Sequence, residues 1–105
     1  MTAFQGGDLE TFRIWVQNKL VYPPKAITKG ISGRVTAQFA VTSKGEVVDV
    51  KILRGAVYSL DKETYRDVMS SPKWEAAKQG GRDVRQQFVM PVIFTTQKAL
   101  EKYIN

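Results

Sequence analysis

A hairpin pattern occupies residues 34–53, which read RVTAQFAVTSKGEVVDVKIL. Apolar and polar side chains alternate from Arg34 to Ser43, and such alternation is typical of a strand with one buried face. The turn Ser43-Lys44-Gly45-Glu46 follows, in which Gly45 supplies a positive φ. The chain then returns as a second strand from Val47 to Leu53. The apolar faces are expected to carry Val35, Ala37, Phe39 and Val41 on the first strand, and Val48, Val50 and Ile52 on the second.

A helix is predicted before the hairpin, from about Asp8 to Leu20. Its apolar residues recur at spacings of three and four, and Asp8 is suited to be its N-cap. Pro23 and Pro24 end this helix, because neither residue can donate a backbone hydrogen bond. Pro24 then opens a short helical turn that Gly30 closes.

A second helix and a third strand are predicted after the hairpin. The helix runs from Ser59 to Ser70, with Ser59 as its N-cap. A loop that contains a Gly80-Gly81 turn follows from Lys73 to Asp83. Alternation returns from Val84 to Phe94 and predicts the third strand.

One domain of the α+β class is expected from these 105 residues. Residues 1–7 are expected to be a flexible lead-in, residues 8–94 the folded domain, and residues 95–105 a short C-terminal helical extension. A single helix returns the chain between strands two and three, so strand three should lie antiparallel beside strand one. The prediction is a three-stranded antiparallel sheet in the order 2-1-3, with two main helices on one face.

Pro91 supports an edge position for the third strand. A proline in a central strand removes a ladder hydrogen bond, whereas at an edge its missing donor can face outward. The alternative is that Pro91 ends the strand or lies at a bulge.

The residue inventory excludes several kinds of active site. The chain has no cysteine and no histidine, which excludes a disulfide framework, a thiolate metal site, a zinc enzyme and a Ser-His-Asp triad. Asp61 and Glu63 form a carboxylate pair in the sequence, but residues two apart on a helix do not face each other. We therefore expect no catalytic residues, no metal and no cofactor, and a protein that is not an enzyme.

The net charge is +6, from 16 Lys+Arg against 10 Asp+Glu. Such a charge suits a solvated basic surface, an acidic partner, a membrane surface or nucleic acid. The basic residues are spread along the chain and follow no nucleic-acid-binding motif, so no nucleic-acid partner is expected. No segment is apolar over the roughly 18–20 residues that a membrane span requires. Residues 1–9 also lack the features of a signal peptide, so work outside the cytoplasm would require a preceding segment that has been removed.

Short motifs spread over residues 4–94 resemble the C-terminal domain of TonB energy transducers. The motifs are Phe4-Gln5-Gly6-Gly7, Tyr22-Pro23, Gly33-Arg34-Val35, Phe39-Ala40-Val41 with Gly45, Leu60-Asp61, Pro72-Lys73-Trp74, Val84, and Met90-Pro91-Val92-Ile93-Phe94. They occur in the family's order and spacing. Two departures are Glu75-Ala76-Ala77, where the family usually has a proline and a glycine, and Thr64, where it usually has alanine. Tyr22, Phe39 and Trp74 are expected to be core anchors rather than ligand contacts.

The resemblance implies a periplasmic, partner-binding domain of an inner-membrane-anchored protein. In such a transducer a preceding membrane helix, missing here, works with the proton-driven ExbB–ExbD complex. The C-terminal domain grips the TonB box of an outer-membrane transporter, which joins the sheet as an extra strand. The edge that matches in this chain is the third strand and its flanks: Arg82, Val84, Arg85, Gln86, Gln87, Phe88, Val89, Met90, Pro91 and Val92.

A self-associating structural module is the alternative function. An unpaired edge strand is also a template for pairing with its own copy, which would give a homodimer without energy transduction. The sequence leaves these two functions open, because both use the same backbone edge.

Overall fold

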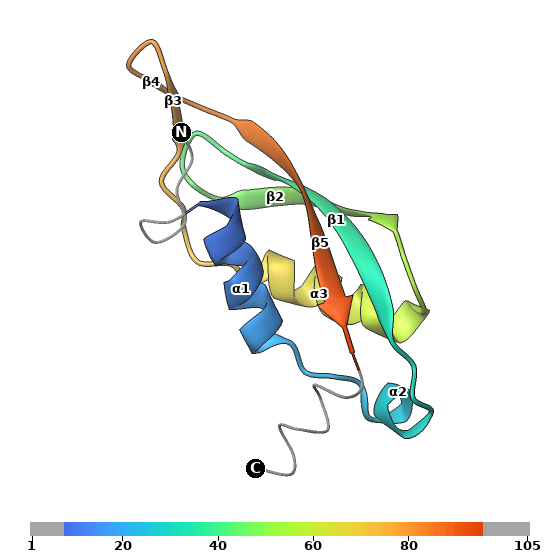
Figure 1. Cartoon of the computed structure of the whole chain (residues 1–105). Coiled ribbons are helices and arrows are strands. Elements are labelled where there is room, and N and C mark those ends of the chain that lie inside the picture. Colours follow the sequence, from blue (N-terminus) through green and yellow to red (C-terminus); the bar gives the residue numbers. More distant parts are fainter. Residues whose placement is uncertain (1–7, 96–105) are drawn as a thin grey trace.

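The computed structural model describes residues 8–95. The predicted lead-in 1–7 and residues 96–105 of the predicted extension lie outside that range. The elements are α1 (Leu9–Lys19), α2 (Pro24–Thr28), β1 (Gly33–Val41), β2 (Val47–Arg54), α3 (Tyr58–Met69), β3 (Ala77–Gln79), β4 (Arg82–Val84) and β5 (Gln86–Phe94) (Figure 1). Within residues 8–95 no helix is long and apolar enough to cross a bilayer.

The main sheet has the order β2-β1-β5, and β1 is antiparallel to both neighbours. This confirms the predicted order 2-1-3, with β5 as the third strand. The helices α1 and α3 pack on one face of the sheet (Figure 1), where the core lies between them and the strands. In the described range 8–95, no helix covers the opposite face of the sheet.

Local signals explain where α1 begins and how the chain leaves it. The Thr11 backbone N–H donates to Asp8 Oδ1 at 3.1 Å, which confirms Asp8 as the N-cap. Phe12 and Val16 lie one turn apart and are both fully buried. The predicted turn after Pro23 is α2, and Gly30 follows it with a φ of 66°.

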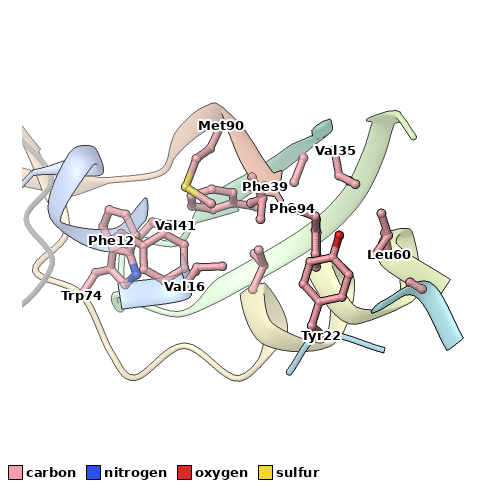
Figure 2. Packing of buried hydrophobic residues seen from close by; sticks show 14 residues of the cluster. Phe12, Val16, Tyr22, Val35, Phe39, Val41, Leu60, Trp74, Met90 and Phe94 are labelled. Atoms are coloured by element: carbon pink, nitrogen blue, oxygen red, sulfur yellow. The ribbon is translucent and has the colours of Figure 1, made fainter. Parts of the chain in front are cut away.

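Aromatic packing dominates one end of the core. The ring centroid of Trp74 lies 4.9 Å from that of Phe12 and 5.8 Å from that of Phe39, and Figure 2 shows Phe12 and Trp74 together there. At the other end, the ring of Tyr22 meets Phe94 edge-on at 5.5 Å. The prediction that Tyr22, Phe39 and Trp74 are core anchors is confirmed by their burial.

Gly45 joins the hairpin turn to this aromatic cluster. Its φ is 82°, which favours glycine. The Trp74 backbone N–H donates to the Gly45 carbonyl at 2.8 Å. A Cβ on residue 45 would lie 2.0 Å from the Trp74 carbonyl oxygen. Glycine is therefore required for both the backbone conformation and the close approach of the loop after α3.

Strand β2 differs from its predicted face. Its pairing with β1 shifts register between Gln38 and Ala40, and Asp49 has a φ of 53°. One extra residue at a bulge moves the following side chains to the other face. Val47 packs against the core together with Val50 and Ile52. Val48 does not, so its predicted place on the apolar face was wrong.

The start of α3 also differs from the prediction. Its N-cap residue is Val57, and no side chain caps it there, so Ser59 is not the cap. Asp61, in the first turn, accepts a hydrogen bond from the Ala56 backbone N–H at 2.9 Å. A carboxylate in the first turn suits the positive end of a helix. Thr64, the departure from the family pattern, is fully buried and donates its hydroxyl to the Leu60 carbonyl at 2.9 Å.

Two carboxyl groups lie where α3 meets the end of α1. Glu63 accepts from the Val21 backbone N–H at 2.9 Å and from Arg66 at 2.8 Å. Asp67, one turn later, is fully buried. Burial, and after it the adjacent Glu63 carboxyl, raise the pKa of Asp67 to about 7. Asp61 and Glu63 bind different partners, as predicted, and the carboxyl that faces Glu63 is Asp67.

Candidate functional site

The candidate site is the outer edge of β5. One side of β5 pairs with β1 over nine positions, from Gly33 opposite Phe94 to Val41 opposite Gln86, without a register shift. Among residues 8–95 no strand pairs with its other side. A regular strand with no partner strand on one side has the geometry that an added strand requires.

Hydrogen bonds at Ile93 show which backbone groups of β5 face outward. The Ile93 N–H donates to Gln17 Oε1 at 2.7 Å, and Gln17 Nε2 donates to the Ile93 carbonyl at 2.9 Å. These groups point away from β1, toward α1. Backbone groups alternate between the two sides of an antiparallel strand. Gln87, Val89 and Pro91 therefore also present their backbone groups outward.

Pro91 lies on the outward side of β5, where its missing N–H removes no bond to β1. The strand continues past it to Phe94 and pairs with β1 throughout. The edge position predicted for Pro91 is confirmed. Neither the predicted alternative of a strand end nor that of a bulge at Pro91 is observed.

The side chains of β5 divide between two faces. Met90 and Val92 are fully buried, and Phe88 packs against the core. These three predicted site residues hold the strand on the domain, and their backbone groups face β1. Gln86 is exposed at the start of the strand. On the open face, Gln87 is exposed and the side chain of Val89 is 51% exposed.

The predicted third strand is interrupted before Gln86. Arg82 and Val84 belong to β4, which pairs with β3 in a separate two-stranded hairpin. The predicted loop from Lys73 to Asp83 therefore contains strand structure around its Gly80-Gly81 turn. Ala77, in the segment that departs from the family pattern, is buried opposite Val84. Strand β5 begins at Gln86, where the chain leaves one hairpin and enters the main sheet, and the first outward position is Gln87.

An ion pair crosses the open face of the sheet next to this row. Arg85, between β4 and β5, pairs with Asp49 at the bulge of β2. Both side chains are more than half exposed, so the pair contributes little to stability. Together with Gln38, Lys51 and Gln87 they line a shallow hollow on the face opposite the helices.

One residue at this edge, Gln17, was not predicted from the sequence. It lies in α1, whose expected role was only to cover the core, and it is 76 positions away from Ile93. A polar residue next to the buried Val16 gives no local sign of such a contact. Only the packing of α1 beside β5 brings the two together.

Comparison with known proteins identifies the family. Residues 18–96 match the family described as Gram-negative bacterial TonB protein C-terminal. The chain belongs to this family. A TonB protein of Pseudomonas aeruginosa is 31% identical over 78 residues, which are 74% of this chain and 23% of that protein. The matched segment is thus about a quarter of that relative's length.

Solved structures of TonB C-terminal domains share the fold. The solution structure from Pseudomonas aeruginosa superposes with a TM-score of 0.62 at 29% identity, covering 75% of this chain and 80% of that one. The solution structure of Helicobacter pylori residues 194–285 gives a TM-score of 0.67 at 20% identity, covering 85% of this chain and 94% of that one. The three-stranded sheet with its helices is therefore the fold of the TonB C-terminal domain.

Proposed function

We propose that this chain is the periplasmic, partner-binding domain of a TonB-type energy transducer. In this proposal it grips the TonB-box segment of an outer-membrane transporter, which adds as a fourth strand to the outer edge of β5. Membership of the TonB C-terminal family supports the proposal. The observation that carries it is the regular β5 edge, with no strand on its outer side among residues 8–95.

The backbone groups on this edge suit reversible binding. Gln87 and Val89 each offer an outward N–H and carbonyl, and Pro91 offers a carbonyl. Each hydrogen bond formed there contributes about 0.5–1.5 kcal/mol net. Association itself costs several kcal/mol, so the sum gives a contact of moderate strength. Because backbone groups make the bonds, transporters with different side chains can share one site.

The rest of a TonB protein would supply the energy. The chain matches about a quarter of its Pseudomonas relative, and we propose that a preceding inner-membrane segment connects it to the ExbB–ExbD complex. A pull along a paired strand loads its hydrogen bonds together in shear. A contact of moderate strength would then carry force briefly and release.

Charged groups flank the open row and favour an acidic peptide. Arg82 is exposed beyond the start of β5, and Lys51 lines the hollow beside Gln87, next to the ion pair of Arg85 with Asp49. The net charge of the whole chain, +6, is also positive. Complementary charge raises the association rate more than the affinity, and the effect weakens with salt.

Replacement of Val89 by proline tests the edge directly. The N–H of Val89 points outward, so proline removes a donor from the open row without breaking the β1–β5 ladder. Pro91 already occupies the same side of β5, which shows that this strand accommodates the ring. Val89→Thr is the matched control, because it keeps the N–H and the β-branched shape.

Calorimetric titration with a synthetic TonB-box peptide gives the readout. Val89→Pro should weaken binding about three- to tenfold, while Val89→Thr should bind within about twofold of the parent, since only proline removes a hydrogen bond. Equal binding by a folded Val89→Pro variant would exclude the β5 edge. Sedimentation with and without peptide separates transporter binding from the alternative function. A self-associating module would form a dimer through the open edge that peptide does not dissociate.

A further inference from the structure

The Gln17 carboxamide occupies the β5 edge in the way that an added strand would. It donates one hydrogen bond to the Ile93 carbonyl and accepts one from the Ile93 N–H, at 2.9 and 2.7 Å. A residue of a neighbouring antiparallel strand makes the same pair of bonds with the residue opposite it. The contact therefore closes one position of the outward row.

This contact is made at the surface, where water could satisfy both groups of Ile93 equally well. Both hydrogen bonds are solvent-exposed, and Ile93 as a whole is 40% exposed. The backbone groups of Ile93 are therefore not buried groups that need the Gln17 carboxamide as a hydrogen-bond partner. Covering exposed edge groups is, in contrast, a known way for proteins to prevent unwanted strand pairing.

The position of Gln17 divides the row into an open and a closed part. Gln87, Val89 and Pro91 lie on the open part, and no hydrogen-bonding side chain among residues 8–95 is placed against them. Ile93 lies on the closed part. Gln17 is near the C-terminal end of α1 and its neighbour Val16 is fully buried, so the helix holds the carboxamide in place.

We propose that Gln17 sets the register and the length of strand addition at this edge. An added peptide pairs with the row from Gln87 to Pro91 and stops there, because the next outward position is already bonded to Gln17. A peptide that extends further gains no net hydrogen bonds, since it must first displace the carboxamide. This inference rests on the proposed binding of a peptide to β5.

The test compares Gln17→Ala with the matched control Asn18→Ala, an exposed neighbour on the same helix. Each variant and the parent are titrated with a short TonB-box peptide that spans Gln87 to Pro91. They are also titrated with two longer peptides, extended by three residues at one end or the other. Because a strand runs in one direction, only one of the extensions can reach Ile93.

For the parent and for Asn18→Ala, the short and long peptides should bind within about twofold of each other. For Gln17→Ala, one extended peptide should bind about fivefold more tightly than the short one, the factor that two modest hydrogen bonds supply. The short peptide should bind all three proteins alike. Equal binding of short and long peptides by Gln17→Ala would overturn the inference and leave the proposed function standing.

Amide hydrogen exchange at Ile93 supplies a second, independent readout. In the free protein, Gln17→Ala should speed exchange at Ile93 while Asn18→Ala leaves it unchanged. Unchanged exchange in Gln17→Ala would overturn the closure itself. If the parent binds none of the peptides, the proposed function fails, and the exchange result still decides whether Gln17 closes this position.

Discussion

The two edges of the sheet are built differently. Strand β5 pairs with β1 over nine residues in a single register. Strand β2 shifts register twice, and Asp49 lies in the left-handed region at the first bulge from the turn. Bulges and charged residues twist an edge and hinder pairing with another chain, and β2 also carries Asp49, Lys51 and Arg54 on exposed positions. One edge is therefore irregular and charged, and the other is regular and open.

Under the proposed function, this asymmetry would give an added strand a single place to pair. A sheet with two regular edges would accept strands on both sides and grow. Here the helices cover one face of the sheet, and the bulges interrupt the regular pairing geometry of the β2 edge. Gln17 closes one end of the β5 edge. The part that is left is short, which suits the proposed binding and release of one peptide segment.

The largest expected effect is on stability, because the two edge strands contribute different amounts of buried side chain to the core. Met90 of β5 is fully buried, whereas Ile52 of β2 is only partly buried against the core. Met90→Ala should lower the free energy of unfolding by about 2–5 kcal/mol. Ile52→Ala should lower it by about 1–2 kcal/mol, because less apolar surface is lost. Urea unfolding of both variants checks the order, and equal losses would show that the two strands are anchored alike.

A pH change should act on the β2 side through α3, which packs over β2. Folded Asp67 keeps its proton up to a pKa of about 7, whereas its value without burial is 3.8. Between these values the folded state binds more protons than the unfolded state, so the free energy of unfolding falls as pH rises. We expect a loss of about 1–3 kcal/mol from pH 5 to pH 8.

Asp67→Asn provides the control for this pH dependence. Asparagine keeps the shape of the side chain but cannot titrate, so unfolding measured at pH 5 and pH 8 should differ much less than in the parent. Peptide affinity at the β5 edge should change little over this range, because residues 86–94 contain no ionisable side chain. An unchanged slope in Asp67→Asn would assign the pH dependence to another group.

The smallest expected effect concerns the ion pair that joins the two edges. Asp49→Asn removes the charge that pairs with Arg85 and keeps a residue that tolerates the left-handed conformation. Since the pair is exposed, stability should fall by less than about 0.5 kcal/mol. The released Arg85 should bind an acidic peptide slightly faster at low salt. A stability loss above about 1 kcal/mol would show that the pair holds the bulge in place.

Much of the fold could be predicted because its signals are local. The alternation of β1, the Asp8 cap, the Gly45 turn and the helix stops at Pro23 and Pro24 each depend on a few neighbouring residues. The edge position of Pro91 followed from one backbone rule. The predicted face of β2 failed at Val48, because a bulge depends on the pairing with β1 and leaves no regular mark in the sequence.

The candidate site was predicted at the level of the strand but not of its atoms. The predicted set mixed residues whose backbone faces outward, such as Val89, with residues that face β1 and the core, such as Met90. The sequence pattern shows which side chains of the strand are apolar. In β5 these residues direct their backbone N–H and carbonyl groups toward β1, away from the outer edge. The pairing of Arg82 and Val84 with β3 was also missed, since a three-residue strand is too short to show alternation.

The amino-acid sequence by itself determined the class of fold, the order of the strands and the edge position of the third strand, because periodicity, prolines and glycines act over a few residues. The family was indicated by the resemblance of short motifs, and the family match confirms it. Tertiary structure alone decided which groups of that edge are available. The bond between Gln17 and Ile93 spans 76 positions, and the full burial of Asp67 depends on how α3 packs on the rest of the domain. Contacts between distant segments arise only when the chain is folded, so a local pattern carries no record of them.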